Sequence, residues 1–542
     1  MNNYKLQITN AKLPSLRTSF CAHPWAAWVC VLLVVETVSF ATLFDPLANA
    51  IACAVVGFVV FILGWRKPTL GLAALLLENM VGSFGYLLQI NLGQPAISLR
   101  IVMFATFFAG WLINAVQAKA FNDLKSLLFG LKPYFILAVL VVYAIVRGYL
   151  LGQRQFLVSD ANAWLELAVL IPVCDIAYRQ RERIRRDFIS VIYTGIGWLA
   201  AKTFILEYLF AHKLGGESLS YVYVWVRRTG VGEITRVIQS AYRIFFQSHI
   251  FAVAAATFCA SKLFSERHDE TALSLRATAF ANAVASAQSK SARQSLDSRD
   301  CFVVATPRND KLIPWLFSAA AWFIIGLSLS RSFWLGTAAG LICLAALLIR
   351  KRNFLWSRVF LFATSAFAGV LLMLAALAFP LPPVSFDFGG VVSSRANLSE
   401  DAVVSRWQLL PAMVEKIKTH PILGSGFGST IVYESKDPRV VALTGGRYET
   451  YAFEWGWLGF WVKFGVLGIL VMVWILVSLG RRIWRLDEPL WLRAGAVATL
   501  FALSVVHFFT PYLNHPLGFA FLLVGEGLIR SNKNYAPRKT IT

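Results

Sequence analysis

The chain has 542 residues, of which 57% are hydrophobic and 15% are charged, and its formal net charge is +22. A soluble domain carries roughly 25% charged residues, so the composition excludes an ordinary soluble protein and indicates one that lies in a membrane. The basic residues fall in short clusters between apolar runs, a pattern that orients membrane spans and argues against a nucleic-acid partner.

About fourteen apolar runs are long enough to cross a bilayer, which takes roughly 20 residues of helix. They lie near residues 24–44, 47–65, 69–88, 98–117, 133–151, 162–178, 188–211, 244–264, 313–330, 332–349, 359–379, 457–479, 490–508 and 513–529. The sequence therefore predicts an all-α polytopic membrane protein. Residues 47–50 (LANA) resemble a signal-peptidase site, but a long polar segment precedes the first run, so we expect the first span to stay uncleaved.

Basic clusters occupy every second connection between these runs. They include Lys5, Lys12 and Arg17 before the first run, Arg66 and Lys67, Lys119, Lys125 and Lys132, the arginines of 179–186, residues 350–352, the arginines of 481–485, and Arg530, Lys533, Arg538 and Lys539 at the end. By the positive-inside rule, these connections and both termini face the cytoplasm.

Three connections are longer than hairpins. Residues 266–311 are rich in Ala and Ser, which predicts a disordered or loosely helical cytoplasmic linker. The other two, 212–243 and 380–456, fall on the outward side. We therefore divide the chain into an N-terminal bundle of about eight spans at 1–265, the linker at 266–312 and a C-terminal core at 313–542.

The outward loop 380–456 contains the pattern of an amphipathic helix. Ser399 followed by two acidic residues is typical of a helix start. Helical spacing relates the apolar residues Val403, Trp407, Leu410, Val414 and Ile417. Pro411 should kink or divide this helix. We expect the helix to lie on the membrane surface, where its basic residues Arg406, Lys416 and Lys418 face lipid phosphates or substrate; simple surface docking is the alternative.

Gly424, Gly426 and Gly428 follow the helix in the sequence GSGFG. Glycines let backbone N–H groups approach an anion, so a phosphate-binding loop is one interpretation. The Lys-Ser/Thr pair of a nucleotide-binding loop is missing, which favours a tight turn between the surface helix and the next span.

Polar residues near the outward ends of the spans are candidates for chemistry. Arg331 lies at an outward hairpin, where it serves as a topological signal or as a guanidinium that grips a pyrophosphate through two hydrogen bonds. Within spans, Glu36, Glu78 and Lys202 are candidates by position alone.

Glu449 and Glu454 stand among Tyr448, Tyr451, Trp455, Trp457 and Trp461. Aromatic residues are ordinary at a membrane interface, but they also offer stacking faces to sugars. A carboxylate there could deprotonate a sugar hydroxyl if it were buried enough to favour the neutral acid. The outward loops lack HExxH and DxD patterns, so no metal site is predicted.

Together these residues resemble the O-antigen polymerase and ligase superfamily of bacterial inner-membrane glycosyltransferases. The resemblance rests on LSLSRSFWLGTAAGL (327–341), then one span and a long outward loop that contains Arg406-Trp407, THPILGSGFGS (419–429) and an aromatic-rich entry into GVLG (465–468). It covers residues 327–470, and the earlier spans match only in hydropathy and in their basic outward loop.

The resemblance implies a donor glycan on polyprenyl pyrophosphate at the periplasmic face. The acceptor would be another lipid-linked glycan or a lipid core, and no nucleotide, metal or other cofactor is implied. Arg331 and Arg406 would stabilise the charge of the pyrophosphate leaving group. Other substrate contacts would come from Arg227, Arg228, Arg236, Arg243, Trp407, Gly424, Gly426 and Glu449. Other proteins of polysaccharide biosynthesis or export are expected partners.

One position departs from the pattern of the ligases. Those enzymes typically carry a His-Asn pair eleven residues before the GVLG-like turn, where this chain has Glu454 and Trp455. We therefore expect a polymerase of exopolysaccharide or capsule, located in the bacterial inner membrane, with Glu454 as the base. An O-antigen-type ligase and, from another class, a lipid-linked oligosaccharide flippase are the alternatives.

Overall fold

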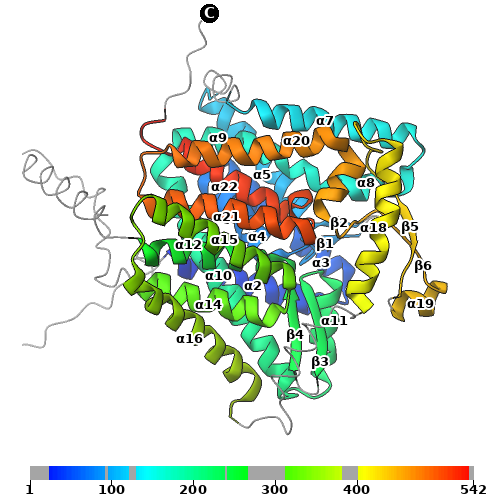
Figure 1. Ribbon diagram of the computed structural model, residues 1–542, viewed down its shortest axis with the longest axis horizontal. Helices are drawn as coiled ribbons and strands as arrows, with labels where there is room; N and C mark the ends of the chain where they lie inside the picture. Colours follow the sequence, from blue (N-terminus) through cyan, green and yellow to red (C-terminus); the bar gives the residue numbers. More distant parts are fainter. Residues whose placement is uncertain are drawn as a thin grey trace, which may run out of the picture.

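In the computed structural model, helices run side by side along one axis and the longer loops gather at the two ends of the bundle (Figure 1). The structure describes residues 24–91, 96–120, 130–238, 241–265, 312–380, 401–436 and 438–535. The predicted linker 266–311 and the first part of the outward loop, 381–400, lie outside the described residues.

The described residues form helices and short hairpins. The α-helices are α2 (Pro24–Ala41), α3 (Pro46–Arg66), α4 (Pro68–Gly82), α5 (Leu99–Gln117), α7 (Lys132–Leu150), α8 (Arg154–Ala161), α9 (Leu170–Arg179), α10 (Arg181–Ala211), α11 (Ser218–Arg228), α12 (Ile250–Phe264), α14 (Leu312–Ser328), α15 (Arg331–Arg350), α16 (Val359–Ala378), α18 (Asp401–Thr419), α19 (Pro438–Thr444), α20 (Gly456–Trp484), α21 (Leu490–Phe509) and α22 (Pro516–Arg530). Four 3-10 helices are η1 (Asn162–Val169), η2 (Gln247–His249), η3 (Trp356–Arg358) and η4 (Tyr512–Asn514). The strands pair as antiparallel hairpins: β1 (Gln89–Ile90) with β2 (Ile97–Ser98), β3 (Gly232–Ile238) with β4 (Ala241–Phe246), and β5 (Ile431–Glu434) with β6 (Arg447–Thr450).

The membrane character of the fold is confirmed. Among the described residues, nine helical segments are long and apolar enough to cross a membrane, and α2, α4 and α14 are shorter apolar helices. Each predicted apolar run contains a helix. However, α12 and α22 have 15 residues each, or about 22 Å, which is shorter than the ~30 Å hydrocarbon core. In the part of the chain that the structure describes, length and composition therefore support nine spans, fewer than the sequence predicted.

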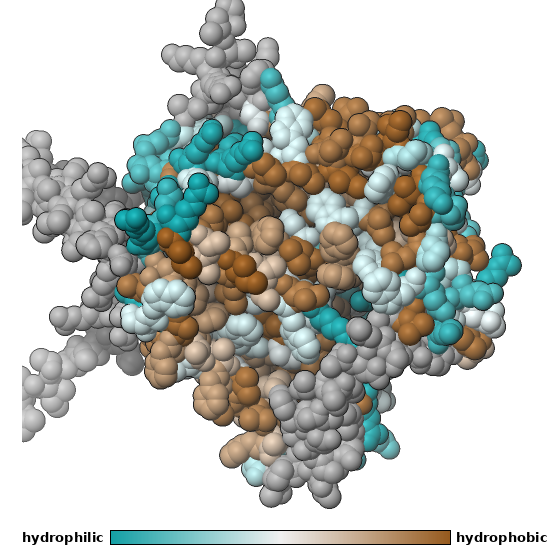
Figure 2. Space-filling model, viewed as in Figure 1, coloured by the Kyte–Doolittle hydropathy of each residue, from teal (hydrophilic) through white to brown (hydrophobic). Residues whose placement is uncertain are grey.

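The two ends of the bundle differ in composition. Arg66, Arg179, Arg350 and Arg530 all lie in the last turn of their helices, at the end of the bundle where α22 ends; we call it the basic end. The other end, which we call the loop end, carries α11, α18, α19 and the strands β3 to β6 (Figure 1). Figure 2 shows a largely hydrophobic surface between hydrophilic residues at these two ends. This arrangement is the one that the alternation of basic connections predicted.

The three charged residues that the sequence singled out within spans are paired. Lys202 Nζ lies 2.7 Å from Glu36 Oε1, and Arg100 Nε lies 2.7 Å from Glu78 Oε2. Unpaired charges at such depth are costly, so these pairs explain the intramembrane Glu36, Glu78 and Lys202 without a catalytic role.

Trp164 of η1 joins the helices that position the loop end. Its ring lies 5.0 to 6.0 Å from the rings of Phe427, Phe460, Phe464 and Phe519. Contacts at these centroid distances are typical of stabilising aromatic pairs. They bind η1 to α20, to α22 and to the segment that follows α18.

Candidate active site

The segment Pro421–Gly428, which we call the strap, is inserted into helix α20 at Gly465. Gly465 has φ of +69° and interrupts the helical backbone. Four backbone hydrogen bonds join the two segments: Ser425 N–H to Val462 O (2.6 Å), Gly426 N–H to Lys463 O (3.0 Å), Val466 N–H to Pro421 O (3.0 Å) and Leu467 N–H to Ile422 O (3.4 Å). An unbroken helix would pair residue 466 with 462 and 467 with 463. The strap satisfies all four of these groups.

The strap glycines are needed for close packing. Gly424, Gly426 and Gly428 have φ of +69°, +83° and +76°, which other residues adopt at a cost. A Cβ at any of them would overlap neighbouring backbone, at Lys463, Gly148 and Gln153 respectively. Their own N–H groups donate to His420 O, Lys463 O and the Asp160 carboxylate. The structure therefore makes the GSGFG segment a packed turn. The anion-binding interpretation of Gly424 and Gly426 does not fit, because their amides are already engaged.

A buried ion pair fixes the strap to the bundle. Lys463 Nζ pairs with Asp160 Oδ1, and both side chains are almost fully buried. The other Asp160 oxygen accepts the Gly428 N–H at 3.0 Å. Removing one partner of such a pair leaves an uncompensated buried charge. Asp160 of α8 therefore ties the strap to α20 immediately before the break at Gly465.

Helix α18 crosses the loop end and packs on β5 and on the start of α20 (Figure 1). Its buried residues are Leu409, Met413 and Ile417, at intervals of four. The predicted apolar stripe was wrong in part, because Trp407 and Val414 are exposed. Pro411 does not divide the helix, which continues from Asp401 to Thr419. The buried face of α18 is thus rotated about the helix axis relative to the apolar stripe that the sequence predicted.

Two of the predicted catalytic residues meet at this helix. Arg406 Nε of α18 pairs with Glu454 Oε2, which precedes α20. The Arg406 side chain is 43% exposed and that of Glu454 is 51% exposed. The pair is therefore accessible to a substrate. From the sequence we expect a base at Glu454 to be a buried carboxylate, but Glu454 is not buried in this conformation.

The backbone beneath this pair is anchored. Trp455 is only 8% exposed, and its Nε1 donates to the Arg406 carbonyl at 2.9 Å. Its ring lies 5.9 Å from that of Phe509 at the end of α21. The exposed Trp407 stands edge-to-face on Trp455, 5.4 Å between centroids. An exposed aromatic face thus lies next to an exposed guanidinium and carboxylate.

Glu449 lies apart from this pair on the β5–β6 hairpin. It is opposite Val432 in the strand register, and both side chains are exposed. The next residues along the strands, Tyr433 and Tyr448, contact each other at 5.9 Å. Successive residues of a strand point to opposite faces, so Glu449 faces away from the side of the hairpin that these tyrosines occupy.

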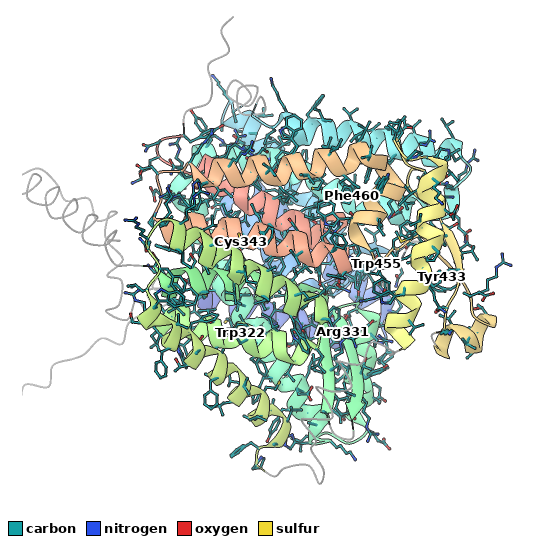
Figure 3. The ribbon with its side chains drawn as sticks, in the orientation of Figure 1. Trp322, Arg331, Cys343, Tyr433, Trp455 and Phe460 are labelled. Atoms are coloured by element: carbon teal, nitrogen blue, oxygen red, sulfur yellow. The ribbon has the colours of Figure 1, made fainter. Side chains whose placement is uncertain are left out.

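Arg331 is the first residue of α15, at the same end of the bundle as Trp455 (Figure 3). The next residue, Ser332, hydrogen-bonds Thr510 at 3.1 Å between hydroxyl oxygens. Thr510 follows Phe509, which packs on Trp455. A short series of contacts therefore connects the turn of Arg331 with the Arg406–Glu454 pair.

The arginines of the first outward loop have separate surroundings. Arg227 lies 3.4 Å from Glu233, and Arg228 lies over the ring of Phe44 at 5.7 Å. Arg236 is exposed on β3. Arg243 of β4 instead turns inward, and its Nε donates to the Ser328 carbonyl at 2.9 Å. Arg243 thereby contacts the turn before Arg331.

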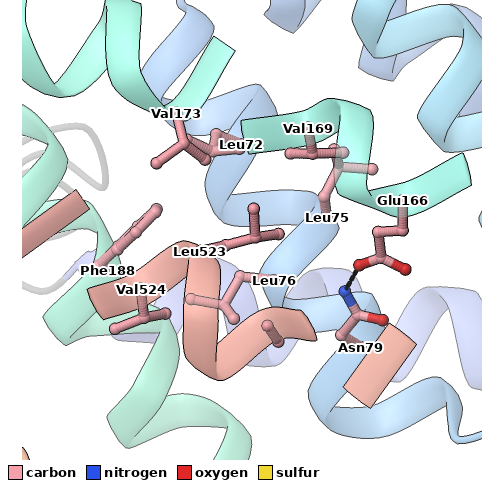
Figure 4. Close-up of a pocket in the computed structure, with 11 residues that line it drawn as sticks. Leu72, Leu75, Leu76, Asn79, Glu166, Val169, Val173, Phe188, Leu523 and Val524 are labelled. Carbon is pink, nitrogen blue, oxygen red and sulfur yellow. Dashed lines mark hydrogen bonds between the residues drawn. The ribbon is translucent and has the colours of Figure 1, made fainter. Parts of the chain in front are cut away.

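The described residues include no group of His, Cys, Asp and Glu that could hold a metal ion. The cavity in Figure 4, of about 20 Å³, is lined mostly by aliphatic residues with Asn79 and Glu166 at one side. It has room for a water molecule but not for a glycan.

Several of these features carried no recognisable signal in the sequence. Asp160 and Lys463 are 303 positions apart, and no local pattern pairs them. The sequence did show THPILGSGFGS and GVLG in order, but not that the first is inserted into the second. The sequence indicated an association of these two segments only through their occurrence in the same region of the chain.

Part of the chain is similar to a known protein family. Residues 316–473 match a family model described as O-antigen ligase. The match begins within α14 and includes α15, α16, α18, the strap and the break in α20, and it confirms the resemblance found in the sequence over 327–470. No curated protein and no solved structure matches the chain.

Proposed function

We propose that the chain polymerises oligosaccharide repeats carried on polyprenyl pyrophosphate. The proposal is supported by the match of residues 316–473 to a family model described as O-antigen ligase. The product would be an exopolysaccharide or a capsule, made at the periplasmic face of the bacterial inner membrane. The observation that carries this proposal is the exposed Arg406–Glu454 pair beside Trp407. It joins an anion-binding group, a proton acceptor and a sugar-stacking face at one end of the bundle.

In the proposed reaction, the donor pyrophosphate binds Arg406 and Arg331 and competes with Glu454 for the Arg406 guanidinium. The released carboxylate accepts the proton of the acceptor hydroxyl. The hydroxyl oxygen attacks the anomeric carbon of the donor, and the bond from that carbon to the pyrophosphate oxygen breaks. The electron pair leaves with polyprenyl pyrophosphate, whose charge the two guanidinium groups stabilise.

The ion pair makes the proposed base conditional on donor binding. Arg406 donates a hydrogen bond to Glu454, so this carboxylate oxygen is already engaged. Donor binding would free it. Water would then be less able to replace the sugar hydroxyl as the nucleophile in the resting enzyme.

The choice of polymerase over ligase rests on Glu454, which occupies the position where ligases typically carry histidine. The test uses the purified protein in liposomes with a polyprenyl-pyrophosphate-linked repeat. We expect lipid-linked multimers and free polyprenyl pyrophosphate, separated by gel and identified by mass spectrometry.

Two other outcomes would overturn the proposal. Glycan transferred only to an added lipid-core acceptor would make the protein a ligase. Movement of intact donor between leaflets, without any new glycosidic bond, would make it a flippase. The R331A protein separates the enzyme from the flippase, because the enzyme would still bind donor weakly and lose turnover, whereas a flippase would fail to move lipid.

A further inference from the structure

The turn between α14 and α15 holds an unfavourable backbone conformation. Leu329 has φ of +47°, a region that residues with a bulky side chain rarely occupy. Only Leu329 and Ser330 separate the last residue of α14 from Arg331, the first residue of α15. The direction in which Arg331 leaves the bundle therefore depends directly on this turn.

Hydrogen bonds from the turn's own residues hold it in part. Ser328 Oγ donates to Ile325 O at 2.7 Å and accepts the Ser330 N–H at 3.3 Å. The Leu329 N–H donates to Gly326 O at 3.2 Å. These contacts are local, and they leave the carbonyl of Ser328 without a helical partner, since it is the last residue of α14.

Arg243 supplies that partner from a different element. Its Nε donates to Ser328 O at 2.9 Å, and its guanidinium lies 4.6 Å from the centre of the Phe245 ring. Phe245 in turn stacks on Phe333 of α15 at 5.8 Å. A cation at a helix C-terminus is favoured by the helix dipole. Strand β4 therefore fixes both sides of the turn, α14 through Arg243 and α15 through Phe245.

We propose that Arg243 is a positioning residue for Arg331 and not a ligand of the substrate. This inference rests on the proposed function for the role of Arg331 in turnover, although the structural part stands alone. Loss of the Nε donor would free the end of α14 and let Leu329 relax toward an ordinary backbone conformation. Arg331, at the start of the next helix, would then lose its fixed orientation.

The two roles of Arg243 predict different effects of conservative changes. A substrate ligand would act mainly through its positive charge, so R243K would keep much of the activity, and R243Q would raise the KM for the donor. A positioning residue acts through the Nε–H, which lysine lacks. Both variants would then lower kcat by roughly tenfold, with the KM unchanged within about twofold.

A second substitution makes the kinetic test specific. Glycine accepts a positive φ without steric cost, so L329G removes the strain that Arg243 helps to hold. We expect the double variant R243Q/L329G to recover most of the kcat lost in R243Q. No recovery, or a large increase in KM in either single variant, would overturn the positioning role.

A readout independent of activity separates this inference from the proposed function. In the full-length chain carrying R331C, a maleimide is reacted for increasing times, and the label at residue 331 is quantified by peptide mass spectrometry. We expect labelling to accelerate several-fold when R243Q is added and to return toward the starting rate with L329G. Equal rates in all three proteins would refute the positioning claim even if turnover changes. A response of the labelling rate in a protein that transfers no glycan would leave the claim standing and refute the function instead.

Discussion

At the scale of single residues, the Arg406–Glu454 pair adds little to the stability of the fold. Exposed ion pairs contribute about 0–1 kcal/mol, and both members here are close to half exposed. Their backbone is nevertheless held firmly, since the buried Trp455 bonds the Arg406 carbonyl. The backbone at Arg406 and next to Glu454 is therefore held in place, although the ion pair between the two side chains contributes little to the free energy of unfolding.

Alanine substitution of the neighbouring Trp407 and Trp455 should affect different properties, glycan binding for Trp407 and stability for Trp455. W455A removes a buried ring and a hydrogen bond, so we expect a loss of about 3–5 kcal/mol in the free energy of unfolding. Trp407 is 58% exposed, so W407A should leave stability within about 1 kcal/mol while weakening glycan binding by roughly fivefold. Unfolding in mixed micelles and donor binding to the detergent-solubilised protein measure the two effects. Equal losses of stability would contradict the assignment of Trp407 to the substrate.

At the scale of elements, the strap accounts for the order of two sequence motifs. The sequence correctly predicted a helix that covers 401–419, a tight glycine turn and a helical hairpin at Arg331, while the predicted helix start at Ser399 lies outside the described residues. It missed the buried face of α18 because Trp407 and Val414 fit the same helical period as residues that are buried. It also missed the break in α20, since Gly465 is one of three glycines in the apolar run 457–479 and nothing in the sequence distinguishes it from the other two.

Two glycines of α20 provide a matched test of the strap. A Cβ at Gly465 would overlap the carbonyl of Ile422, and its φ is +69°, whereas a Cβ at Gly480 meets nothing within 4 Å. G465A should destabilise the protein by about 1–3 kcal/mol or more and lower turnover. G480A should be neutral, or stabilising by up to about 1 kcal/mol. Thermal unfolding in detergent compares them, and a neutral G465A would contradict the strap insertion.

At the scale of the whole molecule, hydropathy predicted the class of fold better than the number of spans. The run near 244–264 was counted as one span, but its first residues form the end of β4 and η2, and the remaining helix has 15 residues. Most of α12 is buried. Hydropathy records burial against protein and burial in lipid alike, so short internal helices look like spans.

The different compositions of the basic end and the loop end predict which side of the membrane each end faces. Lys418 is exposed at the loop end and Arg485 is exposed at the basic end. The positive-inside rule places the basic end in the cytoplasm. In spheroplasts treated with a membrane-impermeant maleimide, K418C should therefore be labelled and R485C should not, until the membrane is permeabilised. Labelling of R485C alone in sealed spheroplasts would reverse the proposed orientation and remove the site from the periplasmic face.

The most direct measurement is the size of the lipid-linked glycans made by an E454Q strain, with E415Q as the control. Glu415 belongs to an exposed ion pair with Lys418 on the same helix as Arg406, so E415Q should make normal polymer. The amide of E454Q cannot accept the proton of the hydroxyl, so single lipid-linked repeats should accumulate without polymer while the protein inserts normally. Polymer of normal length in the E454Q strain would contradict the assignment of the base to Glu454.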